Sequence, residues 1–228
     1  ETGTPQWKKK TIKVYWQSAK PRATQQSLDD IPRDIEGWLS AKVGRKFGRT
    51  EAAAHVTGDA ILKPRGFLTY TAATAMTTPN YDAIIQVPML AAAAITTDGL
   101  IDVKFSLLEE YLSNAAWMCN RLTVAEIMKL KGGDGQYIWR DGIQEAQPSM
   151  LLGLPLRMAP SMPIVAANAL SVALADWREA YTIVDRAGIS VQRDPYTVKP
   201  FVEFYTRRRI GGDVTNTQAI VIGKVSAT

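Results

Sequence analysis

The sequence predicts an α+β protein in which a compact middle segment is inserted between two chain ends that together form a second domain. Three observations support this interpretation. A long stretch near the N-terminus has the apolar spacing of one helix. Short strands and helices recur through residues 67–192. Alternating segments at both ends of the chain have strand chemistry but no core of their own.

The long helix is expected over residues 32–55, which would span about 36 Å at 1.5 Å per residue. Asp29 and Asp30 are the expected N-cap residues, Pro32 is compatible with a first turn, and Gly58 is the expected stop. The opposite face is basic, so we expect the helix to be a strut with one buried apolar face and one solvent-exposed basic face. The apolar stripe consists of Ile35, Trp38, Leu39, Val43 and Phe47.

Residues 1–20 open the chain with strand chemistry. Apolar and polar residues roughly alternate from Trp7 onward, and the run Lys8, Lys9, Lys10 has nothing apolar to bury. A lysine-rich strand with two polar faces is typical of a sheet edge or a projecting arm. The chain starts at Glu1 with neither a Met nor a signal-like pattern, so we expect processing or an upstream segment that this sequence omits.

The middle of the chain predicts a compact α+β domain over residues 67–192. After strand fragments and loops we expect a helix over residues 98–111, a buried strand in AAWMCN, a short helix in TVAEIMKLK and a turn in KGGDGQY. Short strands then recur from QYIW to YTIVDR and ISVQRD. The first of these helices takes its apolar stripe from Leu100, Ile101, Phe105 and Leu108, with Lys104 among them.

The C-terminal segment returns to long extended structure. Residues 201–214 alternate apolar and charged side chains, residues 218–225 predict a final strand, and Gly211 with Gly212 permits a turn or bulge between them. These strands fit poorly in the central domain, and the long helix is the element free to cover them. We therefore predict that the two chain ends form one discontinuous domain.

Composition excludes several classes of protein. The chain has 228 residues and 46% hydrophobic content, enough for a sizeable core, and no apolar run approaches the roughly 20 residues of a membrane span. The single cysteine, Cys119, excludes an internal disulfide and a cysteine-based zinc site. The net charge of +5 is too small and too dispersed to indicate dedicated nucleic-acid binding.

No catalytic, cofactor or metal site is predicted. The single histidine, His55, follows three alanines, and no nucleophile motif accompanies it. The adjacent acidic pairs, Asp29/Asp30 and Glu109/Glu110, do not converge on one point from a helix. KGGDGQ lacks the spacing of a phosphate loop, so we interpret it as a tight turn.

Arg207, Arg208 and Arg209 form the one strong charge run. In a strand the first and third point to one face and the second to the other, so the run is not a single patch. Arginine suits both carboxylates and nucleic acid. We weigh an inter-subunit carboxylate contact, a solvated strand face and nucleic-acid binding, and we favour the first.

Five segments in order resemble one known family. The spine-helix segment of tailed-phage major capsid proteins with the Hong Kong 97 fold is similar to TQQSLDDIPRDIEGWLSAKVGRKFGRTEAAAHVTGDAILKPRGFLTY. Four further segments resemble the same family in the same order. They are LSNAAWMCNRLTVAEIMKLKGGDGQYIW, LLGLPL, VALADWREAYTIVDRAGISVQRDPYTVKPFVEFYTRRRIGGDV and AIVIGKV. The resemblance covers nearly the whole chain, and the subtype is similar to phages and to the gene transfer agents of alphaproteobacteria.

The resemblance implies a domain assignment. Residues 1–20 would be part of an extended E-loop that reaches over a neighbouring subunit. Residues 21–66 and 193–228 would form a peripheral domain with the spine helix, long strands and a three-fold loop. Residues 67–192 would form an axial domain around a five-fold or six-fold axis, and the apolar stripe would be the spine-helix core.

The resemblance also implies contacts between subunits. The E-loop would contribute Trp7, Lys8, Lys9, Lys10 and Lys13. The loop at the three-fold axes would contribute Arg193, Asp194, Pro195, Tyr196 and Lys199. The inter-subunit charges would be Arg207, Arg208 and Arg209, paired with acidic residues of adjacent subunits.

The implied function is that of a structural shell protein, not an enzyme, assembled in the bacterial cytoplasm as pentamers and hexamers around double-stranded DNA. The implied partners are other copies of the chain, DNA in weak non-specific contact, a portal, scaffold or protease, and decoration proteins, with no membrane and no cofactor. Some members cross-link an E-loop lysine to a three-fold-loop asparagine. Residues 193–200 contain no asparagine, so we expect a non-covalent shell.

Two glycines in the long helix suggest flexing. Gly44 and Gly48 are each about 1 kcal/mol weaker than alanine inside a helix. We expect the helix to bend there, so that one sequence can occupy bent and flatter positions of a shell.

Two alternative functions are weighed. An encapsulin-like nanocompartment would have the same fold and a protein cargo in place of DNA. A basic nucleic-acid-binding module would be a monomer whose DNA affinity falls steeply with salt, whereas the capsid hypothesis predicts large closed particles.

Overall fold

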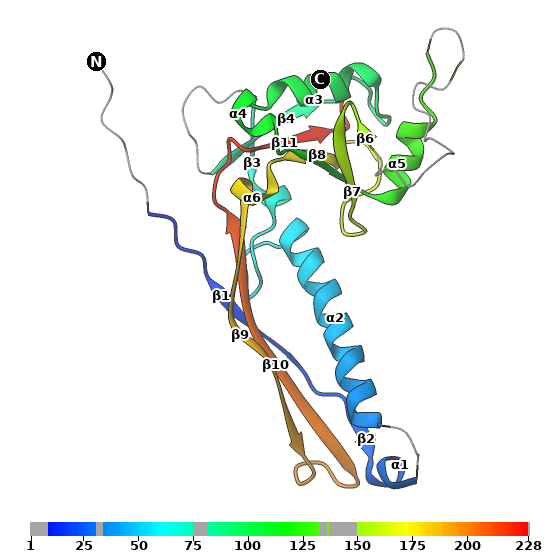
Figure 1. The fold of residues 1–228 in the computed structure, drawn as a ribbon, viewed down its shortest axis with the longest axis vertical. Coiled ribbons are helices and arrows are strands. Elements are labelled where there is room, and N and C mark those ends of the chain that lie inside the picture. Colours follow the sequence, from blue (N-terminus) through cyan, green and yellow to red (C-terminus); the bar gives the residue numbers. More distant parts are fainter. Residues whose placement is uncertain (1–8, 31–33, 75–81, 133–135, 137–149, 228) are drawn as a thin grey trace.

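The structure is a computed structural model that describes residues 9–30, 34–74, 82–132, 136 and 150–227. It has a narrow stalk and a wider head (Figure 1). The stalk is the four-stranded sheet with its flanking helix, and the head is the seven-stranded sheet with its helices. Helices and strands are mixed in both parts, which confirms the predicted α+β class.

Two long antiparallel strands, β9 (Tyr181–Asp194) and β10 (Phe201–Val214), run the length of the stalk (Figure 1). The other edge of β10 pairs first with β2 (Arg22–Thr24) and then with β1 (Val14–Ala19). At about 3.4 Å per residue, each 14-residue strand spans roughly 45 Å. The β9–β10 register shifts between Arg207 and Ile210, where the ladder has an irregularity.

Helix α2 (Ile35–Thr57) lies beside this sheet (Figure 1). Its 23 residues correspond to about 35 Å. The carboxylate of Asp34 accepts a hydrogen bond from Gly37 N at 2.8 Å, and Gly58 N donates to the Ala54 carbonyl at 2.8 Å. The stop at Gly58 is confirmed.

The predicted N-cap is wrong. Asp30 ends a separate short helix, α1 (Gln25–Asp30), and Asp34 caps α2 instead. Gly37 suits this cap, because a Cβ there would lie 2.9 Å from the Asp34 Cγ.

The buried face of α2 differs from the predicted stripe. Val43 and Phe47 are buried, at 8% and 3% exposure, and burying each contributes about 1.5–3 kcal/mol. Ile35 and Leu39 are half-buried. Trp38 is 60% exposed and does not belong to the core of the subunit. At 100° per residue, Trp38 points about 140° away from the buried Val43. Its spacing of three residues from Ile35 therefore does not place it on the buried face.

The head sheet has the order β3-β4-β11-β8-β5-β7-β6. The strands are β3 (Thr71–Ala73), β4 (Ala83–Pro88), β5 (Ala116–Cys119), β6 (Met150–Leu151), β7 (Leu154–Met158), β8 (Leu170–Ala175) and β11 (Ile220–Lys224). The C-terminal strand β11 lies in the middle, parallel to β4 and antiparallel to β8. Its residues Ile220, Val221 and Ile222 are fully buried, as expected for a strand covered on both faces.

Two boundaries of the predicted domains therefore need correction. All of strand β9 but its last two residues lies within the predicted axial segment 67–192, yet the strand pairs with β10 along the stalk. Strand β11 lies within the predicted peripheral segment 193–228, yet it forms the middle of the head sheet. The chain crosses between stalk and head three times, because the β9–β10 hairpin returns to the stalk before β11 rejoins distant partners in the head.

The head has two apolar cores, one on each face of its sheet. One core contains Trp117, Leu174 and Val221 and is covered by α3 (Thr97–Ser106) and α5 (Arg121–Met128). The other contains Phe67, Ile220 and Ile222. The remaining short helices are η1 (Phe67–Thr69), α4 (Glu109–Leu112) and α6 (Trp177–Ala180).

Helix α3 differs from its prediction in length and in orientation. The expected helix over residues 98–111 breaks at Leu107 and Leu108, which have extended backbone, and α4 follows as a separate turn. The residues that enter the core are Leu100, Val103 and Leu107. Three members of the predicted stripe, Ile101, Phe105 and Leu108, are exposed. The helix has two apolar stripes, and periodicity alone selected the outer one.

Smaller predictions also changed. YTIVDR and ISVQRD form the single strand β9, not two strands. Gly211 and Gly212 lie within β10, so they form no turn. The turn in KGGDGQY and the strand from QYIW fall largely outside the described residues. Within the part of the chain that is described, every helix is too short or too polar to cross a membrane.

The cap of α2 gives a direct test. Replacing Asp34 by Ala is expected to lower the free energy of unfolding by about 1 kcal/mol, because Gly37 N loses its acceptor. Asp30→Ala is the control, since this exposed residue does not cap α2. Urea titration of dissociated subunits measures both, and an equal loss in the two variants would contradict the assignment of the cap.

Candidate assembly surfaces and the stalk–head junction

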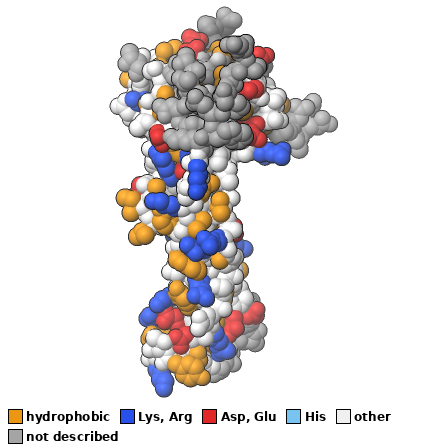
Figure 2. Space-filling model, turned by 90° about the vertical axis from the view of Figure 1, so that its left-hand side faces the viewer, with side chains coloured by type: hydrophobic (Ala, Val, Ile, Leu, Met, Phe, Trp, Pro, Cys, Tyr) orange, Lys and Arg blue, Asp and Glu red, His pale blue; other side chains and the backbone are white. Residues whose placement is uncertain are grey.

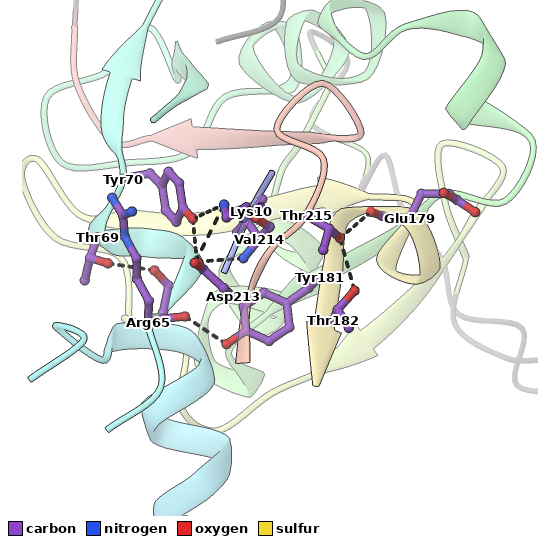
Figure 3. Close-up of polar contacts among 11 residues, drawn as sticks. Lys10, Arg65, Thr69, Tyr70, Glu179, Tyr181, Thr182, Asp213, Val214 and Thr215 are labelled. Carbon is purple, nitrogen blue, oxygen red and sulfur yellow. Dashed lines mark hydrogen bonds and ion pairs between the residues drawn. The ribbon is translucent and has the colours of Figure 1, made fainter. Parts of the chain in front are cut away.

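A polar network holds the stalk to the head (Figure 3). It joins Lys10, which precedes β1, to Tyr70 at the end of η1 and to Asp213 and Val214 at the end of β10. The Lys10 ammonium donates to the Tyr70 hydroxyl at 2.9 Å and to the Val214 carbonyl, and it lies 3.7 Å from a carboxylate oxygen of Asp213. The Tyr70 hydroxyl donates to the other oxygen of Asp213 at 2.5 Å.

Burial sets the ionisation of this network. It lowers the pKa of Lys10, although Asp213 acts in the opposite direction. It also raises the pKa of Tyr70, and the neighbouring Asp213 adds to the effect. The Arg65 guanidinium stacks on the Tyr70 ring, 3.8 Å from its centroid. The Asp213 carboxylate thus lies between the Lys10 ammonium and the neutral Tyr70 hydroxyl, and three chain segments are fixed at one point.

A second cluster fastens the end of α2. The Tyr181 hydroxyl donates to the Arg65 carbonyl at 2.8 Å and lies 2.9 Å from His55 Nδ1. Because the Tyr181 hydroxyl donates its hydrogen to the Arg65 carbonyl, the hydroxyl oxygen accepts a hydrogen bond from the protonated Nδ1 of His55. Burial, and then Arg208, lower the pKa of His55 below its ordinary 6.5. Gly212 is needed beside this pair, since a Cβ there would lie 2.7 Å from both polar atoms.

An ion triad joins α2 to the middle of the stalk sheet. Arg208 Nη1 donates to both carboxylate oxygens of Glu51, at 3.0 and 2.8 Å, and Nη2 donates to Asp185 at 2.6 Å. Glu51 is 9% exposed. Arg208, predicted as an inter-subunit charge, is therefore engaged within its own subunit. Its place on β10 directs it towards α2, where a buried carboxylate requires a cation.

Arg207 and Arg209 lie on the other face of the sheet, as the strand alternation predicted. Trp16 of β1 is paired with Arg209 in the ladder, and its ring lies 5.8 Å from the Arg207 guanidinium and 5.5 Å from that of Arg209. Trp16 is 58% exposed. Among the described residues, neither arginine forms an ion pair with a carboxylate. We call Trp16, Arg207 and Arg209 the outer arginine patch.

The space-filling view looks at this side of the molecule, where β1 and β9 lie in Figure 1 (Figure 2). Basic and hydrophobic side chains are interspersed along the stalk, and acidic side chains gather mainly near its two ends. The middle of this face is therefore suited to an acidic partner.

The predicted three-fold loop forms the tip of the stalk, between β9 and β10. Asp194 folds it by accepting from Tyr196 N at 2.9 Å and from Thr197 N at 3.2 Å. Hydrogen bonds from Thr197 and Tyr196 lower the pKa of Asp194. Tyr196 is 82% exposed. Arg193 lies 3.4 Å from Glu36 at the start of α2, so it contacts its own chain.

The predicted E-loop contacts divide into three groups. Trp7 and Lys8 lie outside the described residues. Lys9 and Lys13 are exposed. Lys10 is engaged in the junction network, and residues 14–19 pair with β10, so this part of residues 1–20 lies along its own subunit.

Sequence reasoning missed the acidic partners. Glu51 could have been found, because it follows Val43 and Phe47 at steps of four residues and so places a carboxylate on the buried stripe. Asp213 and Asp185 had no such signal, since their partners come from distant segments. In the described ranges, no group of three or more His, Cys, Asp or Glu side chains could hold a metal ion.

Comparisons with known proteins agree on one family. The profile described as "Phage capsid family" matches residues 1–225. The capsid of a native GTA particle computed with C5 symmetry is similar, with 38% identity, a TM-score of 0.92, and coverage of 99% of this chain and 77% of that chain. The capsid of an empty GTA particle computed with C5 symmetry is also similar, with 37% identity and a TM-score of 0.88. That match covers 94% of this chain and 74% of the other chain.

A more distant similarity concerns the fold alone. The holo-SrpI encapsulin complex from Synechococcus elongatus PCC 7942 has 12% identity and a TM-score of 0.68, with coverage of 94% of this chain and 75% of that chain. No curated protein matches the sequence significantly.

The ion triad predicts unequal roles for neighbouring arginines. Arg208→Ala leaves Glu51 buried without its cation, and breaking a fully buried pair costs roughly 3–5 kcal/mol. Because Arg208 retains some exposure, we expect a loss of at least about 2 kcal/mol. Arg207→Ala, the matched control on the outer face, should cost less than about 1 kcal/mol. Denaturant unfolding measures both, and similar losses would contradict the triad's role.

Proposed function

Because the chain belongs to the phage capsid family and is a major capsid protein that forms a particle shell, we propose that it assembles as pentamers and hexamers around double-stranded DNA. The observation that carries this proposal is the match over nearly the whole chain, with 37–38% identity to two GTA capsids. The two GTA capsids were computed with C5 symmetry, which is compatible with a five-fold axis in the shell. Hexamers and DNA are proposed from the family.

The shape of the subunit supports the role of a tile. A head with two cores and a stalk roughly 45 Å long are joined by a polar network, so contacts at both ends can meet different neighbours. Heterologous contacts that close around rotation axes produce finite particles. Interfaces of a few kcal/mol per subunit are sufficient when many copies contribute at once.

We assign the two domains by the observed sheets. The peripheral domain comprises residues 14–66 and 181–214, and the axial domain comprises residues 67–180 and 219–225. The segment before β1, with Trp7, Lys8 and Lys9, is proposed as the inter-subunit part of the E-loop. The stalk tip, with Asp194, Pro195, Tyr196 and Lys199, is proposed to meet its copies at three-fold axes.

The shell is proposed to be non-covalent. The tip between β9 and β10 contains no asparagine for a lysine cross-link, so assembly would depend on apolar and ionic contacts. A portal, a scaffold or protease, and decoration proteins are proposed partners on family grounds. The family is a structural one, and we propose that the protein acts as a shell component and not as an enzyme.

The spine helix is proposed to flex at its two glycines. Gly44 and Gly48 lie within α2, and a Cβ at either position would meet no atom within 4 Å. Neither glycine is required by close packing in the isolated subunit. Each glycine stabilises the helix by about 1 kcal/mol less than alanine would, so the helix bends more easily at these two positions.

Two alternatives have specific discriminating outcomes. A shared fold with an encapsulin supports a nanocompartment only at the level of architecture, and a co-purifying protein cargo without DNA would favour it. The outer arginine patch combines cations with an exposed aromatic ring, which suits single-stranded nucleic acid. A monomer with strongly salt-dependent DNA affinity would favour that function.

The shell itself is the first prediction here. Purified protein should form closed particles in negative-stain micrographs, and particles from the complete production system should contain nuclease-protected double-stranded DNA. Denaturing gels of these particles should show a single band at the mass of the monomer, without covalent multimers. A ladder of covalent multimers would contradict the non-covalent shell, and soluble monomers alone would contradict the proposed assembly.

The outer arginine patch gives a prediction about assembly. Arg207→Glu with Arg209→Glu should reduce particle yield, because like charges would then face an acidic neighbour. Subunit stability should change by less than about 1 kcal/mol, since neither arginine has an acidic partner in its own described chain. Lys42→Glu, on the exposed side of α2, is the control. Unchanged yield in light scattering and electron microscopy would refute the inter-subunit role.

A further inference from the structure

The head carries an exposed apolar ridge on α3. Phe105 is 74% exposed, Leu108 is 41% exposed and Ile101 is 37% exposed. Ile101 and Phe105 are four residues apart and lie on one stripe of α3, and Leu108 follows just after the helix, before α4. The opposite stripe of the same helix is already buried in the head core. A helix that is apolar on both sides is typical of one covered on both sides.

A complementary apolar groove lies beside α5. It has a volume of about 540 Å³ and is lined mainly by small or aliphatic side chains. Leu122 and Ile164, at 59% and 51% exposure, are its most exposed large members. The lining includes Ala93, Ala94, Leu122, Ala125, Ile164 and Val165, together with the charged pair Glu126 and Lys129. Its size is within the range of pockets that enclose a large apolar group.

The charges around the two surfaces are opposite. Exposed acids, Asp102, Glu109 and Glu110, flank the ridge. Exposed Arg121 and Lys129 lie on α5, the latter 2.8 Å from Glu126. Lys104 lies 5.9 Å from the Phe105 ring centroid, so two ridges placed against each other would bring together six carboxylates and only two lysines, which is unfavourable. Ridge against groove brings acids towards bases, so the charges select a contact between different surfaces of two copies.

The two surfaces lie towards different ends of α3: Ala93 and Ala94 of the groove precede the helix, whereas Phe105 lies in its last turn. The ridge leads into α4, and in Figure 1 α4 lies at the left of the head and α5 at the right. A contact between two different patches of the same chain is heterologous, and repeated around an axis it closes into a ring.

We propose that Phe105 of one copy inserts into the α5 groove of the next copy around the same symmetry axis. The occupant of the groove is thus a second copy of this chain, and the contact joins neighbouring heads within one pentamer or hexamer. This inference rests on the proposed shell function and adds which surfaces meet.

Engineered disulfides test the contact. Cys119 is buried, and burial raises its pKa to about 12, so it provides an unreactive background. The variants are F105C/L122C and F105C/I164C, assembled and then oxidised with diamide, which takes up the two thiol hydrogens. Denaturing gels without reductant should show a ladder with rungs up to five and six subunits. F105C/I61C is the matched control with another exposed apolar residue, Ile61 at 71% exposure, and should remain monomeric.

The outcomes separate this inference from the shell function. Particles that form without a ladder in either groove variant overturn the ridge-and-groove contact and leave the shell intact. Dimers in F105C alone also overturn it, because they indicate ridge against ridge. Wild-type protein that forms no particles overturns both proposals.

A charge substitution gives an independent readout. Phe105→Glu should lower particle yield at least about tenfold, while its circular dichroism and unfolding midpoint stay unchanged because the side chain is largely exposed. Ile61→Glu should assemble as the wild type does. Wild-type yield from Phe105→Glu would overturn the contact.

Discussion

Strand β10 is the constraint on which the stalk depends. In the described chain it pairs with β1, β2 and β9, and its end at Asp213 and Val214 enters the junction with the head. Because side chains alternate along a strand, its register decides which charges turn inward. Arg208 is directed to Glu51 of α2, while Arg207 and Arg209 flank Trp16 on the outer face. One strand thus sets both the internal fastening of the spine helix and the charge that the stalk presents outward.

The junction shows why directional contacts are used between two rigid parts. Apolar packing is non-directional and tolerates small rotations, whereas hydrogen bonds weaken steeply when misaligned. Lys10, Tyr70 and Asp213 meet from three segments that lie far apart in sequence, and Tyr181 adds a bond to Arg65. This network fixes the direction in which the head leaves the stalk. In a closed shell, that direction is one of the quantities that determine curvature.

Sequence reasoning succeeded where structure is local and failed where it is not. The long helix, its stop at Gly58 and the strand character of residues 201–214 follow from periodicity and cap chemistry. The place of β11 could not follow from it, since it is decided by pairing with the distant strands β4 and β8. Strand β9 was misplaced for another reason, because its hairpin with β10 packs with β1 and α2 near the other end of the chain. The N-cap was misjudged because several aspartates precede the helix, and only the fold shows which one reaches Gly37. Of the inter-subunit arginines, Arg208 was misjudged because its partner Glu51 was not recognised as buried.

The misjudged face of α3 is the most informative of these differences. Hydrophobic periodicity reports that a side chain is removed from water in the working state of the protein, and it does not distinguish a core from an interface. In and just after α3 it selected Ile101, Phe105 and Leu108, which the isolated subunit leaves exposed, along with Leu100, which it buries. Trp38 on α2 was selected in the same way and is also exposed. For a chain that functions only as one copy among many, an apolar stripe that the subunit leaves uncovered is a natural place to look for contacts with neighbouring copies.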